Sequence, residues 1–271
     1  INTEFDEFGF IIRNYGAEAL LGYFSSNRPG GKGKDDIYGF RVAEKPGIKT
    51  FALKGRIINE ATGIVVPAAQ IKILDNNGNI LKGLSAAENG TYQFEIPWEA
   101  GIMLEVTKDK HSVYSASYDE DQMDAIQETV FDIPIAFIED LVEEKEGQTV
   151  IKLKKAYFSR AQSQITPELA LELDKVVDII QKFPELQLRI ESHTDSRGGS
   201  ATNFRISQNR ADAIKAYLTS KGVPGSNILY TIGYGEDKIL NDCTNGVYCL
   251  DTFHKQNERQ LIVVLNYNIL Y

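Results

Sequence analysis

Residues 190–210 read IESHTDSRGGSATNFRISQNR, and this stretch decides the fold of the C-terminal part of the chain. It begins as a strand, passes through a polar, glycine-containing loop that carries Asp195, and continues into a helix that carries Asn203 and Arg210. Asn203 and Arg210 lie about two helical turns apart, so they share one face of that helix. Asp195 can therefore meet Arg210, either as an internal salt bridge that pins the loop to the helix or as a charged pair that binds a ligand.

The residues on both sides of this stretch have the periodicity of an α/β domain. Thr166 is a suitable helix N-cap, with Pro167 at the first helical position and an apolar stripe after it. A second helix is expected over residues 204–221, closed by Gly222. Strands are expected over residues 150–158, 186–192, 228–232 and 260–267. The order is β-α-β-α-β followed by a short helix and strand, which predicts helices packed on a mixed sheet.

Composition limits the classes of function. The chain has 271 residues, 42% hydrophobic and 25% charged, which suffices for two domains of ordinary size. No run of about eighteen apolar residues occurs, so we expect no membrane-spanning helix. The net charge of -9 argues against a nucleic-acid partner, because binding to phosphates depends on Lys and Arg. No catalytic set of carboxylates, zinc ligands or Cys with His stands out, so we expect no enzyme, no cofactor and no metal.

The N-terminal half predicts two β-rich regions. Residues 1–46 contain short aromatic-rich strands and end in a linker-like stretch, Glu44–Gly47. Residues 47–138 contain strands that alternate apolar and polar positions. The acidic stretch Glu139–Gly147 is expected to join this region to the α/β domain, residues 139–271. The expected strands are residues 8–13, 20–25 and 37–41 in the first region and 53–57, 69–73 and 91–96 in the second.

The two cysteines, Cys243 and Cys249, lie close together in a polar stretch. A short-loop disulfide, two free thiols and a metal site are all compatible with this spacing. No histidine stands beside them at zinc-ligand spacing, so we expect the disulfide, as in an oxidising compartment. His254 is near but alone, and we expect His254 and His111 to be surface residues.

The motif around Asp195 resembles the OmpA-like family of C-terminal domains. The resemblance rests on His193, Thr194, Asp195, Gly198, Asn203, Ser207, Arg210 and Ala211, and it continues in order through Tyr217-Leu218, Gly222-Val223, Gly233-Tyr234-Gly235-Glu236, Asn257 and Arg259. It implies non-covalent binding of peptidoglycan through the diaminopimelate of the stem peptide. Asp195 would accept from the ammonium of that residue, and Arg210 would clamp the adjacent carboxylate with its planar fork.

The same resemblance assigns supporting roles. Thr194 and Asn203 would supply neutral hydrogen bonds, and Arg259 would support the pocket from behind. His193 belongs to the motif, although a lone His beside a loop is more often a packing residue than a ligand. The chain departs from the family in two places. Ser159 follows the first-strand aromatic pair where an acid or amide is common, and Glu258 replaces the first of two arginines.

Two resemblances cover the N-terminal half. Residues 47–138 resemble the carboxypeptidase regulatory-like domain, a transthyretin-like β-sandwich, through Gly55-Arg56-Ile57, Pro67-Ala68-Ala69-Gln70-Ile71 and Asn89-Gly90-Thr91-Tyr92-Gln93-Phe94. Residues 23–31 and 35–38 resemble the blade motif of TolB-like periplasmic β-propellers, so residues 1–46 look like a last blade. The alternative for residues 1–46 is an unrelated β-arm that packs on the next domain.

The domain order resembles that of PorE-like envelope proteins of type IX secretion in the Bacteroidota. It implies a periplasmic protein associated with the outer membrane, with peptidoglycan and envelope or secretion-system proteins as partners. The alternative is a periplasmic protein-interaction scaffold in which wall binding is secondary. Residues 1–10 carry acids where a signal peptide would carry bases, so we expect more chain before residue 1.

Overall fold

The computed structural model describes residues 5, 7–15, 19–42, 49–127 and 129–267. The chain divides into two compact units, Ile1–Thr50 and Phe51–Tyr271, which are described separately. The predicted linker Glu44–Gly47 lies outside the described residues. Among the helices that are described, none combines the length and apolar character needed to cross a membrane.

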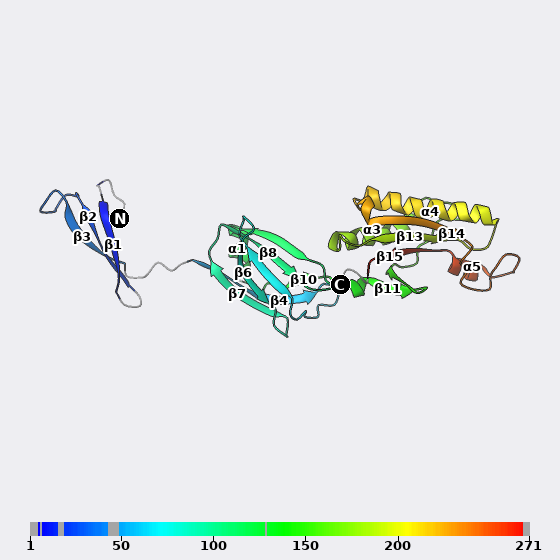
Figure 1. The fold of residues 1–271 in the computed structure, drawn as a ribbon, viewed down its shortest axis with the longest axis horizontal. Coiled ribbons are helices and arrows are strands. Elements are labelled where there is room, and N and C mark those ends of the chain that lie inside the picture. Colours follow the sequence, from blue (N-terminus) through cyan, green and yellow to red (C-terminus); the bar gives the residue numbers. More distant parts are fainter. Residues whose placement is uncertain (1–4, 6, 16–18, 43–48, 128, 268–271) are drawn as a thin grey trace. The chain divides into compact units, whose positions relative to one another are not determined.

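The first unit is an antiparallel sheet of three strands in the order β1-β2-β3 (Figure 1). The strands are β1 (Glu7–Tyr15), β2 (Ala19–Ser26) and β3 (Asp36–Val42), which confirms the three predicted strands. The guanidinium carbon of Arg28 lies 4.7 Å from the ring centre of Phe24 and 4.9 Å from that of Tyr38. Four apolar side chains of β1 are more than half exposed, namely Phe8, Phe10, Ile11 and Ile12.

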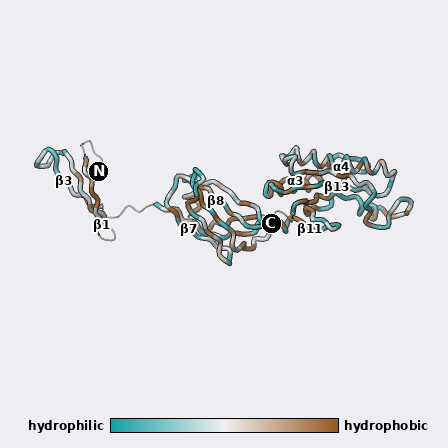
Figure 2. The backbone as a smooth tube through the Cα atoms, viewed as in Figure 1, coloured by the Kyte–Doolittle hydropathy of each residue, from teal (hydrophilic) through white to brown (hydrophobic). Residues whose placement is uncertain are grey.

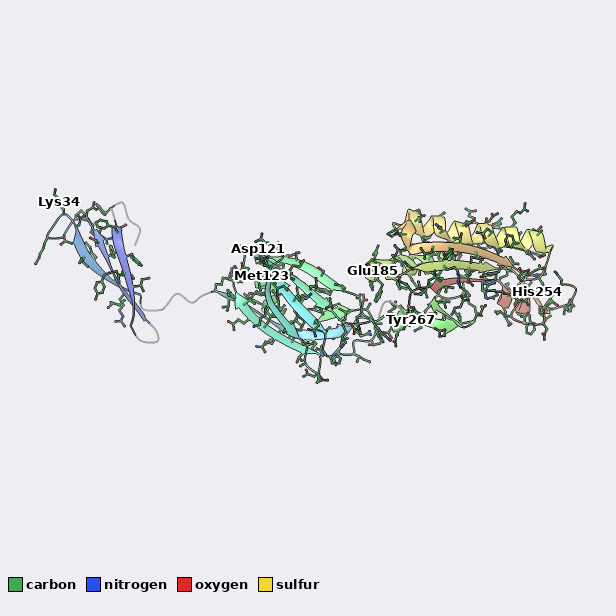
Figure 3. The ribbon with its side chains drawn as sticks, in the orientation of Figure 1. Lys34, Asp121, Met123, Glu185, His254 and Tyr267 are labelled. Atoms are coloured by element: carbon green, nitrogen blue, oxygen red, sulfur yellow. A yellow bond between two sulfur atoms is a disulfide. The ribbon has the colours of Figure 1, made fainter. Side chains whose placement is uncertain are left out.

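The second unit begins with two sheets that enclose one hydrophobic core. One sheet has the order β10-β4-β7 and the other β6-β5-β8-β9. The strands are β4 (Thr50–Asn59), β5 (Gln70–Leu74), β6 (Ile80–Ser85), β7 (Thr91–Pro97), β8 (Gly101–Thr107), β9 (Tyr114–Asp119) and β10 (Ile133–Ile135). Buried and exposed positions alternate along β4, β5 and β7, as predicted, and the backbone of this region carries both hydrophobic and hydrophilic colours (Figure 2). Helix α1 (Glu120–Gln127) adds the fully buried Met123, labelled in Figure 3.

The acidic stretch expected to be a linker is instead regular structure. It forms the short helix α2 (Ile138–Leu141) and the strand β11 (Val142–Lys145), which pairs antiparallel with β12 (Gln148–Ile151). The intervening turn residues, Glu146 and Gly147, have φ of 53° and 73°. Two successive positive φ angles fit the tight turn of a hairpin, so charge alone was a poor guide to this segment.

The C-terminal region is an α/β layer of the predicted kind. Its five-stranded sheet has the order β11-β12-β15-β13-β14, in which β13 and β14 are parallel and the other pairs antiparallel. Helices α3 and α4 lie together on one face of the sheet (Figure 1). The remaining elements are α3 (Pro167–Lys182), β13 (Leu188–His193), α4 (Ser200–Ser220), the 3-10 turn Gly225–Asn227, β14 (Ile228–Gly235), α5 (Asp251–Asn257) and β15 (Arg259–Val264).

The ends of α3 and α4 follow the sequence. The Thr166 side chain accepts a hydrogen bond from the amide of Leu169, which confirms the predicted cap of α3. Gly222 has φ of +96° directly after α4, a conformation that favours glycine. The apolar stripe of α3 is buried and includes Leu173 and Val176.

The predicted strand over residues 150–158 is wrong beyond Ile151, where β12 ends. The backbone amide of Lys154 donates to Glu172 Oε2 at 2.8 Å. A side chain of α3 thus accepts the N–H that a continued strand would donate to its neighbour in the sheet. The only residue pair of the β12–β15 ladder in the described structure is Val150↔Val263. Residues after Ile151 therefore diverge from β15.

Candidate ligand-binding pocket

The loop after β13 is held in shape by Asn203. Its Nδ2 donates to the carbonyls of Asp195 and Arg197, each at 3.3 Å, and to Glu236 Oε2 at 2.5 Å. The amide of Thr194 also donates to the carbonyl of Gly235 at 2.8 Å. The Asn203 amide nitrogen thus holds the loop in shape, and the residue also lines the pocket described next.

A small pocket of about 80 Å³ opens between this loop, the start of α4 and the end of α5. Asp195 and Arg210 both line it, although they are only 6% and 2% exposed. The full lining is Arg160, Ala161, Thr194, Asp195, Arg197, Asn203, Ile206, Arg210 and Glu258. The structure therefore brings the two charged residues of the motif to one opening.

Arg210 is fixed by backbone carbonyls. Its Nε donates to the carbonyl of Gln162 at 2.8 Å and its Nη2 to that of Ser159 at 3.1 Å. The guanidinium lies 5.0 Å from the ring centre of Phe158, and its Nη1 is 3.7 Å from Glu258 Oε2. Burial lowers the pKa of Arg210, while the charges of Glu258 and Asp195 oppose this change. The two hydrogen bonds and the ring contact orient the Arg210 guanidinium, and its Nη1 faces the carboxylate of Glu258.

Asp195 does not form its ion pair with Arg210. Arg197 Nε lies 2.5 Å from Asp195 Oδ2, and the amide of Arg197 donates to Oδ1 at 3.1 Å. The same guanidinium reaches Asp251 Oδ1 at 2.5 Å and Glu258 Oε1 at 3.7 Å. An internal Asp195–Arg210 salt bridge, one of the two alternatives open from sequence, is therefore absent in the described structure.

Glu258 is a pocket residue that the motif alone did not supply. Its side chain is 17% exposed and faces both Arg197 and Arg210. Burial raises the pKa of Glu258, and the neighbouring Asp195 acts in the same direction, while the two arginines oppose it. The departure from the family's double arginine was the signal that this position is unusual. Arg197 could have been noticed as the only cation within the loop.

His193 and Arg259 lie outside the pocket. His193 is fully buried, stacks on Tyr234 with ring centres 5.0 Å apart, and has Nε2 3.6 Å from Glu191. Burial lowers the pKa of His193. Arg259 pairs with Glu146, with Nε 2.6 Å from Oε1, and so ties β15 to the β11–β12 turn. Neither residue lines the pocket: His193 packs inside the domain, and Arg259 forms an ion pair with Glu146.

Thr194 remains available to a ligand. It lines the pocket, and its buried Oγ1 has no hydrogen-bond partner within the described residues. A buried hydroxyl without a partner is costly, so a ligand group at this position would relieve a real deficit.

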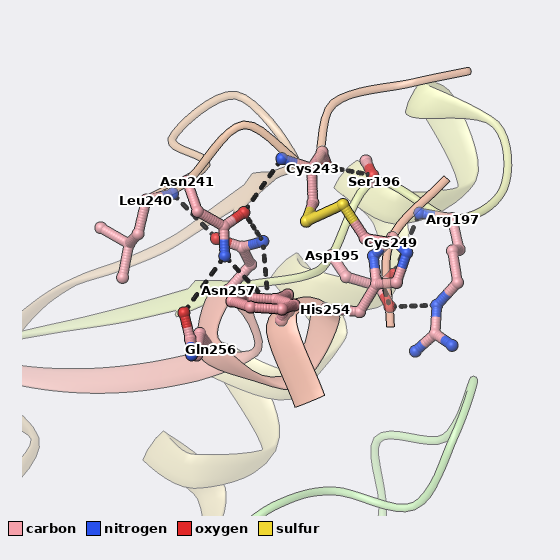
Figure 4. The surroundings of a disulfide bond; sticks show 11 residues. Asp195, Ser196, Arg197, Leu240, Asn241, Cys243, Cys249, His254, Gln256 and Asn257 are labelled. Carbon is pink, nitrogen blue, oxygen red and sulfur yellow. Dashed lines mark hydrogen bonds and ion pairs between the residues drawn. A yellow bond between two sulfur atoms is a disulfide. The ribbon is translucent and has the colours of Figure 1, made fainter. Parts of the chain in front are cut away.

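The predicted disulfide between Cys243 and Cys249 is formed (Figure 4). Ser196 Oγ donates to the carbonyl of Cys243 at 2.6 Å, which joins the disulfide loop to the Asp195 loop. His254 is only 6% exposed, with Nδ1 3.9 Å from Asp195 Oδ2, so the expectation of a surface residue was wrong. The disulfide loop and His254 thus both contact the loop that carries Asp195.

The pocket offers a fixed guanidinium and a carboxylate to one small ligand. Such a pair complements a zwitterion with its ammonium and carboxylate on one carbon, because charged hydrogen bonds of both signs then form together. The described residues contain no cluster of three or more His, Cys, Asp or Glu side chains suited to a metal.

The comparison with known protein families gives a match within the C-terminal region. Residues 157–248 match the OmpA family, so the C-terminal region contains an OmpA-family domain. That family is non-enzymatic, in agreement with the prediction from sequence.

Several curated relatives carry the name peptidoglycan-associated lipoprotein. The one from Buchnera aphidicola is 36% identical over 99 residues, 35% of this chain and 57% of the relative. The one from Brucella melitensis is 33% identical over 112 residues, 41% of this chain and 62% of the relative. The chain thus spans a little over half the length of these relatives.

A solved structure of the peptidoglycan-associated lipoprotein from Burkholderia pseudomallei is 22% identical. The similarity covers 40% of this chain and 87% of that one, with a TM-score of 0.36. The β-rich N-terminal half has no identified relative among these matches.

Proposed function

We propose that the C-terminal domain binds peptidoglycan non-covalently through the diaminopimelate of the stem peptide and anchors this protein to the cell wall. The observation that carries the proposal is one small pocket lined by Asp195 and the carbonyl-fixed Arg210. The similarity of residues 157–248 to the OmpA family supports it.

In the proposed complex, Arg210 Nη1 donates to the ligand carboxylate and Asp195 accepts from the ligand ammonium. Thr194 Oγ1 supplies a neutral hydrogen bond. In the free protein Arg197 already pairs with Asp195. When the ligand binds, Arg197 therefore either shares the Asp195 carboxylate with the ligand ammonium or turns toward the ligand carboxylate. Either rearrangement keeps the pocket's charge balanced.

The affinity of one site should be modest. Each charged hydrogen bond contributes about 1.5–3 kcal/mol, part of which is used to rearrange Arg197. The wall presents many copies of the ligand, so retention arises from rebinding and avidity rather than from one tight contact.

Co-sedimentation with purified sacculi tests the proposal. Asp195→Ala and Arg210→Ala should each abolish pelleting, while Arg205→Ala, an exposed arginine on the same helix, should pellet as the wild type does. Circular dichroism establishes that each variant is folded. If either pocket variant pellets as the wild type does, the ligand-binding role of that residue is wrong. If the protein solubilises the sacculi, it is a hydrolase instead.

The finer assignment follows from the domain order. We propose that residues 47–138 form a carboxypeptidase regulatory-like domain and that residues 1–46 form a propeller blade. We further propose a periplasmic location at the outer membrane, where the anchor holds an envelope complex of the type IX secretion kind.

A second function, a periplasmic interaction scaffold, is favoured by one observation. Four adjacent or near-adjacent apolar side chains of β1 are more than half exposed, and contiguous exposed apolar surface marks interaction sites. Pull-down from envelope extracts with residues 139–271 deleted separates the two functions. If the shortened chain still captures the partners of the full chain, the protein acts as a scaffold. If those partners are lost, it acts mainly as a cell-wall anchor.

A further inference from the structure

A larger groove adjoins the pocket. It lies between the diverging segment after Ile151 and the start of β15, and its volume is about 430 Å³, against about 80 Å³ for the pocket. Glu258 lines both openings. A ligand that fills the pocket with one amino-acid end therefore has room to continue into the groove.

The groove has an apolar base and a free strand edge. Val150, Leu169 and Leu261 form buried parts of its lining, and Tyr157 and Leu240 are more exposed. β15 pairs with β13 from Arg259 to Val264, but with β12 only at Val263. Backbone groups on the open side of β15 can therefore hydrogen-bond to the amides of an extended peptide.

Charge at the rim selects the kind of peptide. Lys154, Lys155 and Lys255 line the groove and form no ion pair within the described residues. The three acidic groups in the groove lining already face other cations, and Glu258 lies 3.7 Å from both Arg197 and Arg210. Glu172 is 2.7 Å from Lys175, and Glu146 is paired with Arg259. Three unpaired ammonium groups over an apolar base complement a short peptide that carries carboxylates.

We propose that this groove binds the acidic peptide that flanks the diaminopimelate residue, so that the domain reads the stem peptide and not only one amino acid. This inference rests on the proposed function of the pocket. The carboxylates of D-glutamate and of the terminal D-alanine are the groups that the lysines contact, and alanine methyl groups lie on the apolar base.

Calorimetry on the full chain with two soluble ligands tests the groove. The ligands are free meso-diaminopimelate and the tetrapeptide L-Ala-γ-D-Glu-meso-diaminopimelate-D-Ala. The tetrapeptide should bind about tenfold more tightly than the free amino acid, since two or more charge contacts are added. The double variant Lys154→Glu with Lys155→Glu should bind the tetrapeptide about tenfold more weakly and free diaminopimelate unchanged.

Two further variants make the result interpretable. Lys32→Glu with Lys34→Glu, on exposed residues of the first unit, has the same change in net charge and should bind both ligands as the wild type does (Figure 3 labels Lys34). Lys255→Glu, on α5, repeats the test from another part of the groove, should the double variant fold poorly.

The outcomes separate the two proposals. Equal wild-type affinity for both ligands, or equal loss in the groove and control variants, overturns the groove while the pocket stands. A wild-type chain that binds neither ligand contradicts the proposed function and the groove with it.

Discussion

The Nε atom of Arg197 lies 2.5 Å from Oδ2 of Asp195, whereas Arg210 directs its Nε and Nη2 at backbone carbonyls. The two arginines therefore have different tasks in the free protein. Arg197 is the counter-ion of Asp195 on the loop after β13, and Arg210 is a fixed donor whose remaining edge faces the pocket. The following predictions use this division.

Arg210→Lys should weaken sacculus binding nearly as much as Arg210→Ala. A lysine keeps the charge but cannot make the fork of bonds to the carbonyls of Ser159 and Gln162 and also face a ligand. Loss of these bonds should lower the free energy of unfolding by about 1–3 kcal/mol. Pelleting and urea denaturation measure the two effects, with Arg205→Lys as control. Undiminished binding would show that only charge matters at this position.

Glu258 should make binding dependent on pH. Because burial raises its pKa, the carboxyl becomes protonated at a less acidic pH than an ordinary glutamate does. Protonation removes the anion 3.7 Å from Arg210 Nη1, so affinity for a ligand carboxylate should increase as the pH falls toward that raised pKa. Glu258→Gln should bind about threefold more tightly at neutral pH and lose this dependence. Calorimetry over a range of pH checks both, and an unchanged profile in the variant would count against the role.

The same raised pKa fixes the sign of the stability effect of Glu258. Its contribution is fully present below the ordinary pKa of glutamate and is lost as the pH rises through the folded pKa. Glu258→Gln should therefore flatten the decline in stability over that window. Thermal denaturation of both proteins across the window tests the sign, and an equal decline in both would be inconsistent with it.

Reduction of the disulfide should loosen the pocket without unfolding the domain. The closed loop is short, so the chain-entropy model gives only about 2 kcal/mol of stabilisation. Since Ser196 contacts the carbonyl of Cys243, affinity should fall severalfold on reduction. Ser196→Ala should reproduce part of this loss with the disulfide intact. Unchanged binding by the reduced protein would separate the disulfide from the site.

Gly233→Ala should destabilise the C-terminal domain. A Cβ at this position of β14 would lie 2.1 Å from the backbone nitrogen of Gln208 on α4, and backbone cannot rotate aside. Overpacking of this kind costs about 1–3 kcal/mol. It also displaces the helix that carries Arg210, so binding should weaken as well. Gly225→Ala, where nothing lies within 4 Å of the added Cβ, is the matched control.

Local rules were sufficient for the helices and insufficient for the contacts of the site. Thr166 and Gly222 act through neighbouring backbone, so the ends of α3 and α4 follow from sequence. The pairing of Asp195 with Arg197 depends on the loop's path. The position of Glu258 beside Arg210 depends on how β15 enters the sheet, which no short window encodes.

The irregular segment after Ile151 shows a related limit. Its apolar residues are typical of a strand, but the Lys154 amide is bonded to Glu172 of α3. This tertiary hydrogen bond competes with pairing between the segment and β15. Its acceptor, Glu172, lies on a helix eighteen positions later in the chain. This competition opens the groove beside β15 and is visible only in the folded chain.

The central claim is that Asp195 and Arg210 read an ammonium and a carboxylate on one carbon of diaminopimelate. Calorimetry with muropeptides that differ only in diaminopimelate or lysine at the third position tests it most directly. Lysine retains the ammonium but lacks the carboxylate, which leaves Arg210 Nη1 without its ligand partner. Its affinity should be lower by about 2–3 kcal/mol, or about thirtyfold to a hundredfold. Equal affinity for the two muropeptides would contradict the assigned roles of Asp195 and Arg210.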